Sequence, residues 1–136
     1  MMRFCKTIFL TFVLLCLAAT AALAASRADE LRSNPNFIAV YANEKGETAF
    51  LRIHSVSVQE YNPPVYQIAA VVTRANEDAE YDVYETYRYN YDNQTIWKHL
   101  FGKWTCLAPA SSAQDNNDAL MAEMMFKYAY GIDFVH

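Results

Sequence analysis

The chain has 136 residues, 11 of them basic and 15 acidic, and its formal net charge is −4. This acidic balance, without any cluster of lysines or arginines, excludes a nucleic-acid-binding protein that works through a basic surface. Ten tyrosines, eight phenylalanines and two tryptophans exclude a disordered chain, because so many aromatic side chains can form a packed core.

The first 24 residues have the pattern of a secretory signal peptide. Arg3 and Lys6 form a basic start, residues 7–23 carry no charge, and Ala22-Leu23-Ala24 is the small-x-small pattern that precedes a cleavage site. A retained anchor is the alternative, but an apolar run of about 17 residues is at the short limit for crossing a bilayer. We therefore expect residues 1–24 to be removed. The protein would then be exported to the periplasm, cell surface or medium without a transmembrane segment.

The remaining residues, 25–136, are enough for one hydrophobic core. They hold nine basic and 15 acidic residues, a net charge of −6. Cys106 is the only cysteine among them, and we expect a half-buried thiol on a strand rather than an intermolecular disulfide. The polar stretch 25–36 is expected to be a flexible leader, and 37–136 a single domain.

Residues 37–107 have the pattern of antiparallel strands separated by turns rich in Gly, Pro, Asn and Asp. In the second strand the apolar alternation slips near His54 and Ser55, which predicts a bend or bulge there. In the last hairpin, about Gly102, Trp97 and Trp104 can pair across the two strands. The predicted strands are 37–42, 48–59, 65–75, 80–91, 95–100 and 103–107.

The segment 80–91 is the most informative of these strands, because tyrosines dominate its odd positions and polar residues its even ones. We expect the odd set to be core residues beneath a helix. The even set, Tyr84, Arg88 and Asn90, together with Trp97 is the candidate recognition surface. Aromatic rings stack on sugars, and Arg and Asn side chains hydrogen-bond hydroxyl or peptide groups. The odd-position tyrosines are Tyr81, Tyr87, Tyr89 and Tyr91.

The C-terminal segment changes to a helical period. Asn117 or Asp118 is expected to cap a helix that runs to Tyr130, with Gly131 as its left-handed stop and Ile132 in hydrophobic contact after it. Together these elements predict an α+β fold, an antiparallel sheet of about five to six strands with one C-terminal helix packed on it. The helix residues expected to be covered are Leu120, Met121, Met124, Met125, Phe126, Tyr128 and Tyr130.

A hydrolase is the alternative to a binding protein, but its candidate residues are few. His54 and Ser55 are adjacent on a strand and point to opposite faces, so they cannot pair directly, and Ser55 could meet His99 only through the fold. A serine at a bend more often bonds the local backbone, and this is the role we expect for Ser55.

Glu85 interrupts the aromatic face of its strand. We expect it near the rim of the sheet, forming an outward salt bridge. If buried, it would need a partner such as Lys98 or Arg52. One carboxylate without a second group does not make a hydrolase, so we regard enzymatic activity as the weaker hypothesis.

No metal or cofactor site is expected from the sequence. The three histidines are far apart, and there is no glycine-rich phosphate loop. The acidic residues Glu77, Asp78, Glu80 and Asp82 lack the glycine and the spacing of a calcium loop.

Several stretches resemble small exported bacterial proteins of uncharacterised function, and the strand order after a signal peptide is more distantly similar to domains of the surface-adhesin E type. The first resemblance implies a secreted protein, and the second implies binding of host or envelope partners through an antiparallel sheet. We therefore expect a non-catalytic module that binds protein or glycan at the cell envelope, with a structural envelope protein as a third hypothesis. The stretches are residues 50–69, with Tyr61-Asn62-Pro63-Pro64; Tyr87-Arg88-Tyr89-Asn90-Tyr91; Trp97 to Trp104; and Phe126 to Ile132.

Overall fold

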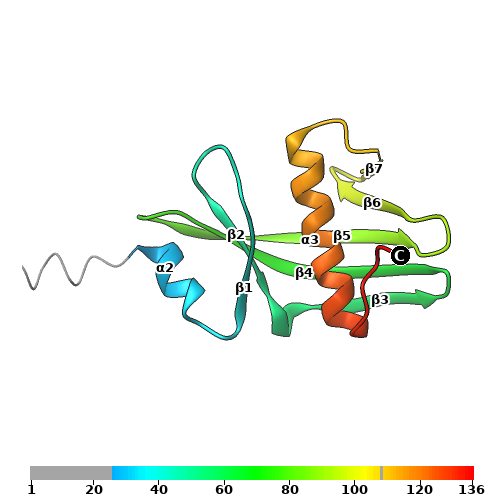
Figure 1. The fold of residues 1–136 in the computed structure, drawn as a ribbon, viewed down its shortest axis with the longest axis horizontal. Coiled ribbons are helices and arrows are strands. Elements are labelled where there is room, and N and C mark those ends of the chain that lie inside the picture. The colour runs from blue at the N-terminus through cyan, green and yellow to red at the C-terminus, as the bar shows by residue number, and fades with distance from the viewer. Residues whose placement is uncertain (1–25, 108) are drawn as a thin grey trace, which may run out of the picture.

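The computed structural model describes residues 26–107 and 109–136, so the predicted signal peptide, residues 1–24, lies outside the described residues. The fold is α+β, as predicted: a seven-stranded antiparallel sheet with the C-terminal helix packed on one face (Figure 1). The elements are α2 (Arg27–Arg32), β1 (Phe37–Ala42), β2 (Thr48–Arg52), η1 (Ile53–Ser55), β3 (Ser57–Asn62), β4 (Val65–Ala75), β5 (Glu80–Asn90), β6 (Thr95–Leu100), β7 (Lys103–Cys106) and α3 (Ala113–Tyr130).

The strand order is β1-β2-β4-β5-β6-β7, and β3 pairs with β4 beside this path. The long hairpin of β4 and β5 forms the centre, with continuous pairing from Val65 opposite Asn90 to Ala75 opposite Glu80. On its other edge β4 pairs with β2 over one half and with β3 over the other. The apolar segment 65–75 is therefore central, as its two apolar faces predict.

The bend expected near His54 and Ser55 is the single turn η1, which divides the second predicted strand into β2 and β3. The hydroxyl of Ser55 bonds the backbone on both sides of this turn. It donates to the carbonyl of Arg52 at 2.6 Å and accepts from the N–H of Val71 at 2.8 Å. The side chain thus replaces a strand partner that the bend removes from β4.

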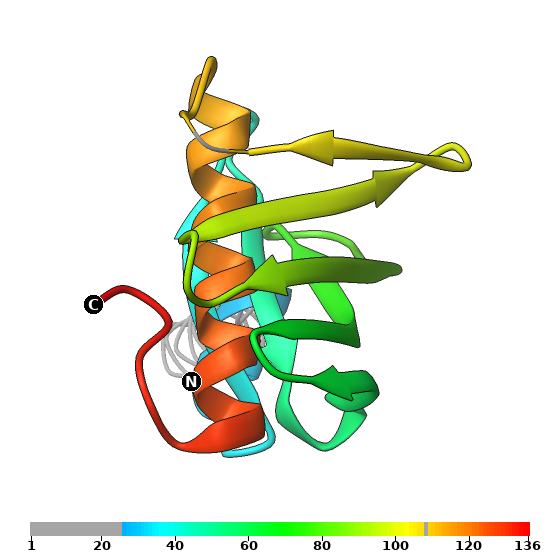
Figure 2. The ribbon, with the colours of Figure 1, turned by 90° about the vertical axis from the view of Figure 1, so that its right-hand side faces the viewer.

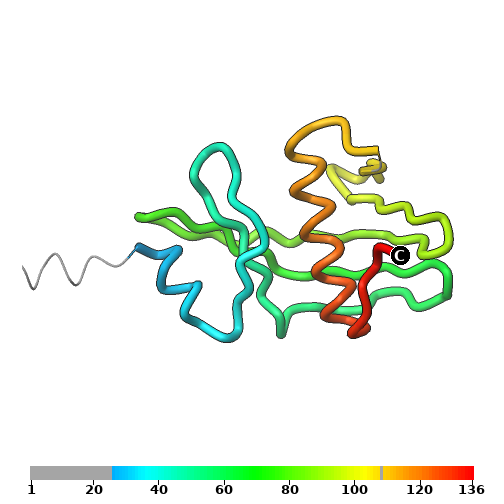
Figure 3. Tube along the Cα trace, viewed as in Figure 1, coloured from blue at the N-terminus to red at the C-terminus, as the bar shows by residue number. Residues whose placement is uncertain are grey.

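The main core lies between α3 and one face of the sheet, and Figure 3 shows the helix crossing the strands. Tyr87 and Tyr89 of β5 are fully buried there, and the Tyr89 hydroxyl donates to the carbonyl of Ala122 at 2.6 Å. Tyr81, expected in the core, is instead 47% exposed. Tyr81 belongs to the end of the sheet where a pocket lies beside the start of α3.

The helix α3 begins at Ala113, earlier than predicted, because Ser112 and not Asn117 or Asp118 is its N-cap. The Ser112 hydroxyl accepts from the N–H of Asp115 at 3.1 Å, and Asp118 is a buried residue inside the helix. Its end is as predicted, because Gly131 has a φ of 72° and its N–H donates to the carbonyl of Lys127.

Two predictions about apolar residues in and after α3 are wrong. Ile132, predicted to pack after Gly131, is exposed, and Phe134 is buried against Phe126 instead. Within the helix Leu120 and Tyr128 are also exposed, whereas Met121, Ala122, Met125 and Phe126 are the buried residues.

The stretch 25–36, expected to be a flexible leader, contains the short helix α2. Its Ala28 and Leu31 are buried against Phe50 and Ala75 on the face of the sheet away from α3. Six residues with two apolar positions give almost no helical period, so the sequence pattern does not indicate this element.

The β6–β7 hairpin has a two-residue connection. Phe101 and Gly102 both have positive φ, 49° and 74°, as in a type I′ turn. This register places Trp97 opposite Cys106 and Trp104 opposite His99, so the predicted direct pairing of the two tryptophans is wrong. Among residues 26–107 and 109–136, no helix has the length and apolar character needed to cross a bilayer.

Candidate functional site

The sheet face away from α3 is not covered by α3 or by the main core, and over β3–β7 we call it the open face. In Figure 2, α3 lies along the other side of the sheet and the β6–β7 hairpin projects away from it. The even positions of β5 point to the open face, because the odd positions Tyr87 and Tyr89 are in the core. Tyr84 and Arg88 are therefore on the open face, and Trp97 faces the same side directly opposite Arg88.

A series of hydrogen bonds on the open face connects side chains of β3, β4 and β5, starting at Tyr84 and ending at Arg88. The Gln59 amide donates to the Tyr84 hydroxyl at 3.0 Å, and the Gln67 amide donates to Oε1 of Gln59 at 2.8 Å. Arg88 then donates to Oε1 of Gln67 at 3.1 Å. These bonds link four long polar side chains into one arrangement, and side chains that are already arranged lose less entropy when they bind a ligand.

At the Arg88 end of this series the face becomes aromatic. The guanidinium of Arg88 lies over the Trp104 ring, 4.3 Å from its centroid, and His99 packs on Trp104 at 4.9 Å. Cys106 is half-buried on this face, opposite Trp97. The rings of Tyr84 and Trp97 are available to solvent, being 63% and 37% exposed, and His99 is exposed as well.

Arg88 is the central charged group of the open face. Within the part of the chain that the structure describes, no carboxylate lies within 4 Å of it, and its buried Nε has no hydrogen-bond partner. A guanidinium in this position can bond an oxygen of a ligand. Asn90 differs, because its Oδ1 accepts from the N–H of Asn93 and thereby closes the β5–β6 turn.

The sequence prediction did not include Gln59, Gln67, His99 and Trp104 among the face residues. The register of the strands decides which face of the sheet these side chains occupy. In β3 an irregularity between Val58 and Glu60 also changes which residues face which side, so simple alternation does not place Gln59. His99 and Trp104 could have been found, because they have the same parity in their strands as Trp97 and Cys106.

Glu85 lies on the opposite face, and the expectation that it is near the rim is wrong. It is 2% exposed, and its Oε1 is 2.9 Å from Nζ of Lys98, one of the two partners proposed for a buried position. Lys98 also contacts Oδ1 of Asp118 at 3.0 Å, and the Tyr87 hydroxyl donates to Glu85 at 2.8 Å. One ammonium therefore joins β5, β6 and α3 inside the core.

Burial governs the titration of this cluster. Burial alone would lower the pKa of Lys98, but the carboxylates of Glu85 and Asp118 outweigh it and raise that pKa. Desolvation raises the pKa of Asp118, because it exceeds the attraction of Lys98. Desolvation also raises the pKa of Tyr87 well above its usual range. All four groups are buried, and their arrangement is that of a buried ion pair network.

The remaining catalytic candidates are not brought together. Ser55 bonds only backbone groups, and His54 bonds the side-chain oxygen of Asn36 at 3.1 Å. His99 belongs to the distant β6–β7 hairpin, where it packs on Trp104. A serine, a histidine and an orienting carboxylate in mutual contact are what a hydrolase of this type requires.

The acidic stretch after β4 has structural contacts. Asp82 accepts from the hydroxyl of Thr73 at 2.7 Å and pairs with Arg52 at 3.4 Å, and Asn76 accepts from the N–H groups of Asp78 and Ala79 in the turn. Across the described residues, no group of three or more His, Cys, Asp or Glu side chains is placed to hold a metal ion.

Comparison with known proteins gives no relative from which a role could be taken. No family model, no curated protein and no solved structure matches the chain. The open face and the pocket beside α3 therefore have to be interpreted from their own geometry.

Proposed function

We propose that this chain is an exported, non-catalytic binding module of the cell envelope or medium, and that the open face is its recognition surface. The observation that carries the proposal is the pre-arranged set of Tyr84, Gln59, Gln67 and Arg88, which is bounded by the exposed ring of Trp97.

A glycan is the partner that this chemistry favours over a protein. Amide, hydroxyl and guanidinium groups lie between two exposed aromatic rings, so hydroxyl groups of a sugar can be bonded while its apolar face stacks on a ring. The buried centre of a protein interface is usually apolar, whereas the middle of this face consists of amide and guanidinium groups. The face is also open to solvent, which suits a chain of sugars better than a small buried ligand.

The experiment is a glycan array probed with the purified protein, followed by titration of the best glycan. Trp97→Ala and Tyr84→Ala are each expected to weaken binding by about tenfold or more, the size found for aromatic anchors. Tyr128→Ala is the matched control, because Tyr128 is 45% exposed but lies on α3. It is expected to bind like the unchanged protein.

The results separate the hypotheses. If all three variants bind equally well, the open face is not the recognition surface. If no glycan binds but an envelope protein does, and Trp97→Ala abolishes that binding, the open face is still the recognition surface and the partner is a protein.

Export is tested separately, by N-terminal sequencing of the protein recovered outside the cytoplasm. The sequence should begin at Ala25, and a protein in the cytoplasm that still begins at Met1 would contradict export.

A further inference from the structure

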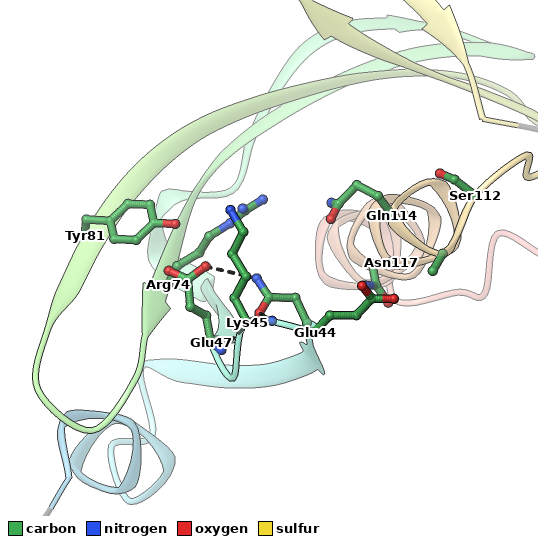
Figure 4. A pocket seen from close by; sticks show the side chains of 10 residues that line it. Glu44, Lys45, Glu47, Arg74, Tyr81, Ser112, Gln114 and Asn117 are labelled. Atoms are coloured by element: carbon green, nitrogen blue, oxygen red, sulfur yellow. Dashed lines mark hydrogen bonds between the residues drawn. The ribbon is translucent and has the colours of Figure 1, made fainter.

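A pocket of about 390 Å³ lies at the end of the sheet that α3 only partly covers. Three elements meet there: the β1–β2 hairpin loop, the outer ends of β4 and β5, and the first turns of α3 (Figure 4). Its volume is within the range of small-molecule sites. The side chains that define its chemistry are Lys45, Glu47, Arg74, Tyr81, Gln114 and Asn117.

Arg74 is a half-buried cation in this pocket, and its side chain also hydrogen-bonds Tyr81. One terminal nitrogen lies 3.4 Å from the hydroxyl of Tyr41, while the buried Nε has no hydrogen-bond partner. Counting the residues that the structure describes, no carboxylate lies within 4 Å of its guanidinium. A partly desolvated guanidinium favours a carboxylate, which it can bond with two parallel N–H groups. Arg74 therefore identifies the wall that attracts an anionic group.

The hairpin loop supplies a second cation and a fixed carboxylate. Lys45 extends into the pocket region beside Arg74 (Figure 4). The Asn43 amide donates to Oε1 of Glu47 at 3.0 Å, and hydrogen bonds from Asn43 and then from Tyr81 lower the pKa of Glu47. Two hydrogen bonds hold the conformation of the loop, because Oδ1 of Asn43 accepts from the N–H groups of both Lys45 and Glu47.

This lining has charges of both signs. Lys45 and Arg74 attract an anion, while Glu44 and Glu47 repel a ligand that is wholly anionic and attract a cation. A multiply charged phosphate is therefore a poor match, and a hydrophobic ligand would remove water from four charged groups without replacing it. A small zwitterion satisfies both sets. The α3 side adds the amide of Asn117, which can bond a peptide group.

We propose that this pocket binds a small zwitterion with a free carboxylate and a free ammonium, namely an amino acid or a short peptide. The carboxylate lies against Arg74 and Lys45, and the ammonium against Glu44, whose carboxylate points towards Asn117 and away from Glu47 (Figure 4). This site is independent of the open face. A protein carrying Trp97→Ala therefore retains it.

The test is a titration followed by backbone amide NMR, with the twenty L-amino acids and the dipeptide Ala-Ala as probes. Shifts are expected in the 43–47 loop and the first turns of α3. Two blocked dipeptides separate the contributions: N-acetyl-Ala-Ala lacks the ammonium, and Ala-Ala amide lacks the carboxylate. Each is expected to bind at least about tenfold more weakly than the best free ligand, because one charged contact is lost.

Two variants locate the ligand. Arg74→Gln is expected to abolish the shifts, and Lys45→Gln, on an exposed loop where it cannot disturb the core, to weaken binding several-fold. Arg52→Gln and Lys103→Gln are the matched controls elsewhere on the surface, and both should bind normally. The proposal is overturned if no probe shifts the loop, if both blocked dipeptides bind as well as the free one, or if Lys45→Gln and Arg74→Gln bind unchanged.

Discussion

The ammonium of Lys98 lies 2.9 Å from Oε1 of Glu85, and both side chains are buried between the sheet and α3. Lys98 is also the partner of Asp118, so its replacement leaves two buried carboxylates without a counter-charge. Removing one member of a buried ion pair costs about 3–5 kcal/mol. We expect Lys98→Met to lower the free energy of unfolding by that amount, measured by urea denaturation.

Lys127→Met is the matched control, because Lys127 pairs with Asp133 at 3.3 Å on the surface. Such exposed pairs contribute about 0–1 kcal/mol. Adding Glu85→Gln to Lys98→Met should recover part of the lost free energy of unfolding. The double variant no longer buries the Glu85 carboxylate without the Lys98 ammonium. Equal effects of Lys98→Met and Lys127→Met would contradict the buried network.

Stability should fall on the alkaline side. The folded-state pKa of Lys98 is raised, as are those of Tyr87 and Tyr89 through desolvation. A group whose pKa is higher in the folded than in the unfolded state holds its proton more tightly in the folded state, and this stabilises the protein. The stabilisation is complete below the unfolded-state pKa, which is about 10 to 10.5 for these groups. It is lost as the pH rises through the folded-state pKa. The free energy of unfolding should therefore be steady from about pH 7 to 9.5 and decrease above about pH 10.

The decrease can be assigned with two tyrosine variants. Tyr89→Phe removes a fully buried titrating group, so the alkaline slope should become smaller by up to about 1.4 kcal/mol per pH unit. Tyr87→Phe removes the second fully buried hydroxyl, whose pKa is also raised by burial, and should reduce the slope as well. An unaltered slope in Tyr89→Phe would show that this hydroxyl does not control alkaline unfolding.

The turn at Phe101 should be improvable. Phe101 is 100% exposed and has a φ of 49°, so its side chain gains nothing from burial in the chain itself while its backbone is in the left-handed region. That region costs a non-glycine residue about 1–2 kcal/mol, and Asn tolerates it better. We expect Phe101→Asn to raise the free energy of unfolding by about 0.5–1.5 kcal/mol.

Gln94 is the comparison for Phe101, because its φ is also positive, 56°. Its amide donates to the carbonyls of Tyr91 and Phe134, at 3.0 and 2.8 Å, so the side chain stabilises the turn. Gln94→Gly should therefore lower the melting temperature, whereas Phe101→Asn raises it. A loss of stability in Phe101→Asn would mean that the aromatic ring supports the hairpin.

Ser55→Ala should destabilise the sheet although Ser55 is outside the core. The N–H of Val71 would lose its acceptor, and an unpaired, partly buried donor costs about 1–3 kcal/mol. Ser57→Ala, in the exposed strand β3, is the control and should change little. If Ser55→Ala unfolds at the same urea concentration as the unchanged protein, the hydroxyl does not serve as the strand partner.

The positions of the strands along the chain followed from the apolar alternation and from the turn residues between them. The C-terminal helix followed from its helical period and from Gly131. All of these are local properties of the sequence. The start of α3 did not, because residues 113–117 contain a single apolar side chain and the sequence offers several good caps in succession. Ser112 acts as cap, since its hydroxyl reaches the N–H of Asp115 and Asp118 is needed by Lys98 inside the core.

The candidate site was partly accessible from the sequence. Tyr84 and Arg88 share a face because they are four residues apart on one strand, which any register preserves. Their contacts with Gln59, Gln67 and Trp104 depend on which strands are neighbours, and that is set by the whole fold. The pocket around Arg74 joins three segments distant in the sequence, so no local pattern indicates it.

Side chains of β5 point alternately to the core and to the open face, so two different constraints act on the residues of one strand. Glu85, Tyr87 and Tyr89 are fixed by the core, whereas Tyr84, Thr86 and Arg88 point the other way and contact little that the core requires. These three positions can therefore change one at a time without loss of the fold. Under the function proposed above, a few substitutions on the open face are enough to change the preferred ligand, and a family built on this fold would be expected to diverge there first.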